Sequence, residues 1–193
     1  MSATRLLVLG VVRRLGRAHG YLVRSELLSW GAEEWANVKW GSIYHALRQL
    51  TKEGLLASTE ITEWPGRVDY EVTEAGDAEF LRLLRDALRG PDHRADILGA
   101  GLALLPALPR AEAVELLRAR LAALEAQHEE VAARLERIAT GGGDPHIREL
   151  PGLRMHGIDS AAEWTRGLIE RLEAGSYPMA GDEADGRPAA PRG

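Results

Sequence analysis

The chain has 193 residues, of which 45% are hydrophobic and 27% charged, with a net charge of −5. These values predict one or two globular domains and exclude a largely disordered chain. The lack of cysteine excludes disulfides, thiolate metal sites and cysteine nucleophiles, and it favours a cytoplasmic location.

The charge is unevenly distributed along the chain. Residues 1–54 contain eight basic and four acidic residues, a net charge of +4, so the acidic excess lies further on. This asymmetry is typical of a binding head joined to a body of another kind. The longest apolar run, 97–109, is too short for a bilayer and contains two prolines, so we expect no membrane partner.

Three helices are expected in the N-terminal part. Residues 4–16 are apolar enough for a largely buried helix, and after a break residues 22–31 form a second helix. A third helix is expected from Val38 to Glu53. Asn37 is its predicted N-cap, and Gly54 stands where a glycine commonly ends a helix.

The third helix is amphipathic. Its apolar stripe is Ile43, Leu47 and Leu50, spaced for one buried face. The opposite face has hydrogen-bond donors and almost no carboxylate: Gly41, His45, Arg48 and Lys52, with Ser42 and Tyr44 beside them. Such a face can reach phosphates and base edges in the major groove of DNA. The alternative is an amphipathic helix whose basic side faces only water.

Two β-favouring segments follow, residues 57–64 and 68–73, around the Pro65-Gly66-Arg67 turn. Helices followed by a small hairpin are the layout of a winged helix-turn-helix. Helices are then expected from Thr73 to Gly90 and over 93–105.

The most regular segment is 110–139. Its apolar positions recur at alternating intervals of three and four, the spacing of a coiled coil. We call these eight positions the seam: Val114, Leu117, Leu121, Leu124, His128, Val131, Leu135 and Ile138. The seam predicts a dimer interface, with packing inside its own chain as the alternative. His128 would set the register of the seam or sense pH or a ligand.

A last helix is expected over 158–174, and residues 179–193 read as a disordered tail. The predicted fold is therefore mainly α with a small β-hairpin wing. It comprises a winged helix-turn-helix DNA-binding domain (1–90), a helical dimerisation and effector domain (91–178) and the tail.

Residues 39–76 resemble the core of the PadR family of winged helix-turn-helix transcriptional regulators. The resemblance lies in short motifs that occur in order: His19-Gly20-Tyr21, Gly41-Ser42-Ile43-Tyr44, Glu53-Gly54-Leu55, Gly66-Arg67 with Tyr70, and Thr73-Glu74-Ala75-Gly76. It implies a ligand-responsive repressor that binds an inverted-repeat operator in double-stranded DNA as a homodimer.

On this resemblance the DNA-binding residues are Lys39, Ser42, Tyr44, His45, Arg48, Lys52 and Arg67. The sequence departs from the family where Val68 and Asp69 follow Arg67, since the family often has basic residues there. Asp69 would repel a phosphate, so Arg67 is expected to act alone in the wing.

The resemblance also implies an aromatic or amphipathic small-molecule effector. Trp40 and Trp164 are the tentative effector-binding residues, because indole faces stack on such ligands. The five tryptophans can equally fill gaps in the fold.

An enzyme is not expected. The segment His128-Glu129-Glu130-Val131-Ala132 lacks the second histidine of a zinc-protease helix, and no cofactor motif is present. No metal site is predicted, although sensing through His93, His146 and His156 stays open. The main alternative function is a coiled-coil scaffold without DNA binding.

Overall fold

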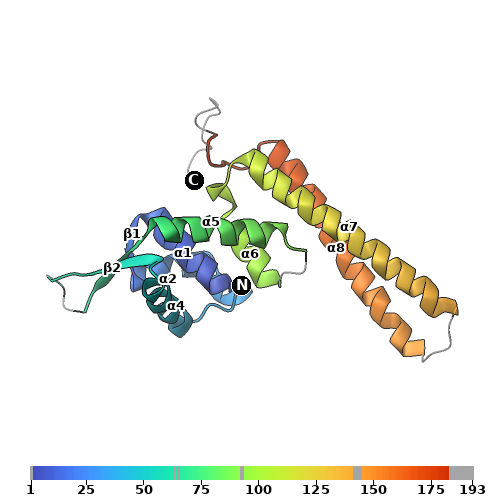
Figure 1. Ribbon diagram of the computed structural model, residues 1–193, viewed down its shortest axis with the longest axis horizontal. Helices are drawn as coiled ribbons and strands as arrows, with labels where there is room; N and C mark the ends of the chain where they lie inside the picture. The colour runs from blue at the N-terminus through green and yellow to red at the C-terminus, as the bar shows by residue number, and fades with distance from the viewer. Residues whose placement is uncertain (1, 63, 65, 92–93, 141–144, 183–193) are drawn as a thin grey trace. The chain divides into compact units, whose positions relative to one another are not determined.

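The computed structural model describes residues 2–62, 64, 66–91, 94–140 and 145–182 (Figure 1). The chain divides into an N-terminal unit, residues 1–88 and 92–105, and a C-terminal unit, residues 89–91 and 106–193. The predicted fold class is confirmed: the protein is mainly helical with one small antiparallel sheet. None of the described helices is long and apolar enough to cross a membrane.

The helices of the N-terminal unit surround α1. This helix is buried along most of its length, as its dense apolar composition predicted. The helices, in chain order, are α1 (Ala3–Leu15), α2 (Gly20–Ser29), α3 (Ala32–Trp35), α4 (Trp40–Lys52), α5 (Glu74–Arg89) and α6 (Ala95–Ala103).

The sheet has three strands in the order β1-β3-β2. β2 (Leu56–Glu60) and β3 (Val68–Val72) form the predicted hairpin, which extends from the helices in Figure 1. β1 (Arg17–His19) was not predicted. It pairs with β3 so that Arg17 lies opposite Glu71, and their side chains form an ion pair of 2.6 Å.

The α6 helix belongs to the N-terminal unit, whereas the sequence assigned it to the C-terminal domain. The reason is close packing on α1. A Cβ at Gly10 would lie 2.5 Å from a methyl group of Leu104, so only glycine lets the Leu104 side chain come this near. Gly101 likewise lies against Leu88 of α5.

The α4 helix begins later than predicted. Asn37 is not its N-cap: it has a positive φ of 49° and precedes the cap residue, Lys39, by two positions. The Ser42 hydroxyl closes the cap, because Oγ accepts from the Lys39 backbone N–H (3.1 Å) and donates to the Lys39 carbonyl (2.6 Å).

Two long helices make up most of the C-terminal unit, α7 (Arg110–Thr140) and α8 (Glu149–Glu173). Short 3₁₀ turns occur at Leu105–Ala107 and Pro145–Arg148. Figure 1 draws α7 and α8 side by side along their length. The α8 helix begins nine residues before the predicted start at 158.

The seam faces α8 of the same chain. A buried cluster joins Leu124 and Val131 of α7 to Ile158 and Ala162 of α8, and Leu121 and Leu135 pack against it. This is the packing that the sequence left as the alternative to a dimer interface. The seam as a dimer interface stays a prediction.

Polar pairs tie the same two helices together along their outer edges. His128 Nδ1 lies 2.8 Å from a carboxylate oxygen of Asp159, Arg166 contacts Glu125 at 2.9 Å, and Arg118 contacts Glu173 at 2.7 Å. His128 is therefore part of the contact between α7 and α8 and is only half-buried.

The start of the predicted tail is folded. The Arg110 guanidinium donates to the carbonyls of Leu172 (2.6 Å) and Tyr177 (2.7 Å) and pairs with Asp182 at 2.5 Å. Residues 179–182 therefore belong to the C-terminal unit, contrary to the predicted boundary. Residues 183–193 lie outside the described residues.

Candidate nucleic-acid interface

The α4 helix exposes the predicted polar face and buries the apolar one. Ile43, Leu47 and Leu50 are at most 2% exposed, whereas Gly41, His45, Arg48 and Lys52 are all exposed. Lys39 is exposed at the N-terminus of the helix. A Cβ built on Gly41 would meet nothing within 4 Å, so the helix backbone is open to a partner at this point.

The C-terminal end of α4 turns sharply into the wing. Gly54, with a φ of 74°, ends the helix: its N–H donates to the Thr51 carbonyl (3.0 Å), and the Leu55 N–H donates to the Leu50 carbonyl (2.9 Å). These two bonds form a Schellman motif, which requires a residue that adopts positive φ. The glycine of the Glu53-Gly54-Leu55 motif therefore sets the direction in which the wing leaves α4.

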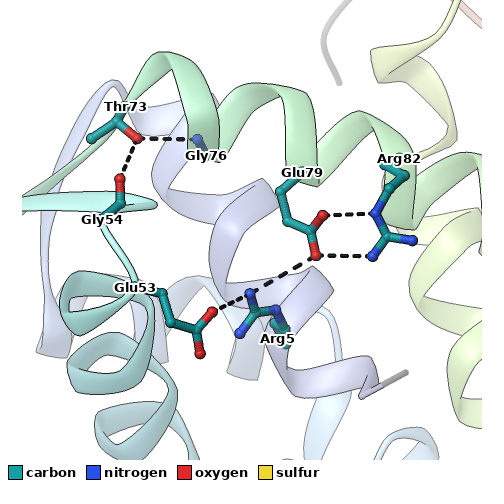
Figure 2. A network of polar contacts seen from close by, with 7 residues as sticks. All are labelled: Arg5, Glu53, Gly54, Thr73, Gly76, Glu79 and Arg82. Atoms are coloured by element: carbon teal, nitrogen blue, oxygen red, sulfur yellow. Dashed lines mark hydrogen bonds and ion pairs between the residues drawn. The ribbon is translucent and has the colours of Figure 1, made fainter.

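The Thr73-x-x-Gly76 motif joins the wing to the same corner, as Figure 2 shows. The Thr73 hydroxyl donates to the Gly54 carbonyl (2.8 Å) and accepts from the Gly76 N–H (3.0 Å), so it caps α5 while holding the end of α4. Gly76 packs so closely that a Cβ there would lie 2.0 Å from the Leu55 carbonyl oxygen.

An ion-pair chain crosses the same corner (Figure 2). Arg5 of α1 contacts Glu53 at 2.5 Å and Glu79 at 3.8 Å, and Glu79 also pairs with Arg82. The hydrogen bond from Arg5 lowers the pKa of Glu53, and that from Arg82 lowers the pKa of Glu79. The only carboxylate near the end of the α4 face is thus neutralised by α1.

Tyr44 lies at the junction of α4 and α2. A Cβ on Gly20 would come within 2.6 Å of the Tyr44 ring. The glycine of the His19-Gly20-Tyr21 motif therefore leaves the space that this ring occupies. The Tyr44 ring centroid is 5.0 Å from that of Trp40, and the guanidinium carbon of Arg24 lies 4.5 Å from the Trp40 ring centroid. Trp40 is therefore part of the α4 surface.

A groove of about 770 Å³ runs between α4, the start of α2 and the wing. Residues that the sequence did not predict for the site make up most of its wall. It is lined by His19, Gly20, Tyr21, Tyr44, Arg48, Trp64, Gly66, Arg67, Val68 and Tyr70. Burial, with the nearby Tyr44 hydroxyl, raises the pKa of Tyr70, whereas Arg48 acts to lower it. Aromatic residues within the family-like motifs were the available signal for Tyr21 and Tyr70.

Arg67 of the wing is paired with a carboxylate of its own chain. Its guanidinium makes two hydrogen bonds to the Asp69 carboxylate, at 2.8 and 3.2 Å, and Asp69 is only 5% exposed. The predicted repulsion of a phosphate by Asp69 stays a prediction; the structure adds that the Asp69 carboxylate is paired with Arg67. Arg67 directly precedes β3 and stands two positions before Asp69, the spacing at which side chains of an extended segment share a face.

The Arg67 hydrogen bond also lowers the pKa of Asp69, outweighing the opposite effect of burial. A carboxylate with a depressed pKa stabilises the folded state above its unfolded pKa of about 3.9, and this contribution is lost as the pH falls through the folded pKa. We expect Asp69→Asn to lower the free energy of unfolding at pH 7 and to reduce its loss below about pH 4.

Urea unfolding at several pH values measures both effects. Glu60→Gln, which removes an exposed carboxylate from the neighbouring strand β2, is the control and should leave the pH profile close to that of the wild type. Equal profiles for Asp69→Asn and the wild type would contradict the stabilising role of the pair.

Structural roles are visible for the predicted residue Ser42 and for two tryptophans that were not predicted for the site. The Ser42 hydroxyl is engaged in the cap of α4, so any phosphate contact there would compete with that cap. Trp30 and Trp35 fill the fold, since the Trp35 indole N–H donates to the Trp30 carbonyl (2.9 Å) and its ring covers Gly99.

Trp40 and Trp164, the tentative effector residues, are 46% and 41% exposed and lie in different units. Their role in binding an effector stays a prediction. Among the described residues no group of three or more His, Cys, Asp or Glu side chains could hold a metal ion, and His93 lies outside these residues.

Residues 8–82 match the model of the Transcriptional regulator PadR-like family, which confirms the resemblance over the N-terminal unit. No protein with a curated function shows significant similarity to the sequence.

Solved structures that this chain is similar to include two of one Bacillus subtilis protein and one of a Bacillus cereus protein. PadR from Bacillus subtilis in complex with operator DNA is 19% identical, over 87% of this chain and 98% of that one, with a TM-score of 0.38. The same protein with p-coumaric acid is 18% identical over 88% and 97%, with a TM-score of 0.38. The PadR-like transcriptional regulator BC1756 from Bacillus cereus is 20% identical over 89% and 98%, with a TM-score of 0.37.

Proposed function

Because the N-terminal unit carries the PadR-like transcriptional regulator domain over residues 8–82, we propose that this protein binds double-stranded DNA through α4 and its wing. The single observation that carries the proposal is the exposed face of α4. Its cations Arg48 and Lys52 point away from the core, while Ile43, Leu47 and Leu50 anchor the helix. A solvated face would need neither an open backbone at Gly41 nor an aromatic groove beside it.

The oligomeric state, the response to a ligand and the type of operator are proposed by analogy with the PadR-like family. The protein would act as a homodimeric, ligand-responsive repressor on an inverted-repeat operator, because two identical heads related by a two-fold axis read two half-sites. Dimerisation is proposed for the α7–α8 hairpin. Within each chain, seam residues of α7 pack against α8 and stabilise that hairpin. Trp40 and Trp164 stay the candidates for an aromatic or amphipathic effector.

The scaffold alternative loses its main support. It rested on the heptad spacing of the seam, and four seam residues of α7 belong to a cluster shared with α8 of the same chain: Leu121, Leu124, Val131 and Leu135. A scaffold also gives no reason for the groove between α4 and the wing.

We expect Arg48→Ala and Lys52→Ala each to weaken binding to DNA about tenfold without changing the oligomeric state. Each removes one phosphate contact, so the slope of log K against log salt should fall by about 1. The measurement is fluorescence anisotropy with a random-sequence duplex of about 30 base pairs, or three helical turns, at several salt concentrations.

Arg154→Ala removes an exposed arginine of α8 and is the matched control, with unchanged affinity expected. Sedimentation of all the variants checks the oligomeric state. Wild-type affinity in both α4 variants would refute the assignment of α4 as the DNA-binding helix.

A further inference from the structure

The wing carries an exposed aromatic side chain beside its predicted cation, Arg67. Trp64 is 64% exposed and lines the groove beside α4, and Tyr21 on the same groove is 62% exposed. Single exposed apolar side chains are common, but aromatic side chains gathered on one groove are typical of a binding surface. None of the described residues that line this groove is a carboxylate.

The backbone holds Trp64 in a fixed position. Its N–H donates to the Ile61 carbonyl (3.0 Å), its carbonyl accepts from the Arg67 N–H (3.0 Å), and the Ile61 N–H donates to the Arg67 carbonyl (3.0 Å). Gly66, with a φ of 86°, completes the turn. These hydrogen bonds join the Trp64 backbone to Ile61 and Arg67 on the two sides of the turn.

The basic residues around the groove differ in whether their side chains are already engaged within the protein or available to bind a phosphate. The Arg67 guanidinium is held by Asp69, which cancels its charge. His19 uses Nδ1 to cap α2, accepting from the Leu22 N–H at 3.3 Å. Arg48 is exposed on α4, and no ion pair is recorded for it within the described residues. The cation available to a phosphate in this groove is therefore on α4.

We propose that the groove holds one sugar–phosphate strand of duplex DNA, with Arg48 on a phosphate and the Trp64 ring against deoxyribose carbons. The wing then binds by apolar contact and contributes almost nothing to the salt dependence, while α4 supplies the charge. This inference rests on the proposed DNA binding and assigns the wing contact to Trp64 in place of Arg67.

The test compares salt dependence rather than affinity alone. With the random-sequence duplex of about 30 base pairs, Trp64→Ala is expected to weaken binding about tenfold, the ratio that follows from losing the burial of one large apolar side chain. Its slope of log K against log salt should equal that of the wild type, because no counterion-releasing contact is lost. Arg67→Ala should change affinity less than Trp64→Ala does.

Trp64→Phe should keep most of the affinity, since a smaller ring still covers the sugar. Leu153→Ala, which removes another exposed apolar side chain from α8, is the control and should bind as the wild type does. Urea unfolding should be unchanged in Trp64→Ala, since the ring is mostly in solvent.

Three results would overturn the inference: wild-type affinity in Trp64→Ala, a shallower salt slope in that variant, or a larger loss in Arg67→Ala. If the wild type binds DNA and depends on Arg48 and Lys52, each of these results removes only the role of Trp64. If the wild type fails to bind DNA at any salt concentration, the proposed function fails as well.

Discussion

Gly76→Ala is expected to destabilise the N-terminal unit by about 3 kcal/mol or more. The added Cβ would lie 2.0 Å from the Leu55 carbonyl oxygen and 3.0 Å from a methyl group of Val72. Neither can retreat easily: the Leu55 carbonyl also accepts from the Thr73 N–H (3.1 Å), and Val72 is in β3. The first turn of α5 must therefore move, which breaks the cap that Thr73 makes.

Urea unfolding followed by tryptophan fluorescence measures this loss. Four of the five tryptophans lie in residues 1–88, so the signal reports chiefly on the N-terminal unit. Gly41→Ala is the matched control, because its Cβ meets nothing within 4 Å and alanine favours a helix by up to about 1 kcal/mol. A Gly76→Ala protein as stable as Gly41→Ala would show that the corner between α4 and α5 is not tightly packed.

Leu124→Asp is expected to unfold much of the C-terminal unit, at a cost of about 3–5 kcal/mol. Leu124 is 2% exposed and packs with Val131, Ile158 and Ala162. The carboxylate would be buried among apolar side chains without a cation in that cluster. The sequence predicted that this substitution breaks a dimer; the structure adds that it first breaks the contact between α7 and α8.

Circular dichroism during urea unfolding detects the loss, because α7 and α8 hold much of the helix in the chain. Ala126→Asp places the same charge on an exposed position of α7 and should cost less than about 0.5 kcal/mol. Sedimentation of both variants separates folding from assembly. A Leu124→Asp protein with wild-type stability that sediments as a monomer would indicate that Leu124 acts between chains.

The sequence was most informative where local patterns decide the structure. The stripe of Ile43, Leu47 and Leu50 follows the helical period, so α4 and its exposed face could be predicted without any knowledge of the neighbouring elements. The hairpin around Gly66 and the glycine end of α4 at Gly54 depend on φ angles that few residues adopt, and they too were predicted.

Prediction was weaker where contacts between residues distant in sequence determine the structure. The β1 strand has only three residues, too few to show a period of two, and it exists because β3 pairs with it. The boundary between the two units also differed, because a single apolar side chain, Leu104, fits against the bare backbone at Gly10.

The sequence by itself thus determined the wing, the exposed face of α4 and every helix except α3 and the first turns of α8, since helical period and turn residues act within a few positions of the chain. Only the tertiary structure showed that the middle of the seam packs on α8 of the same chain, because an apolar stripe is satisfied equally well by a helix of its own chain or of another. It also decided that Arg67 is paired with Asp69 and that Trp64 is exposed in the wing, because charge pairing and burial depend on how strands and turns meet in space.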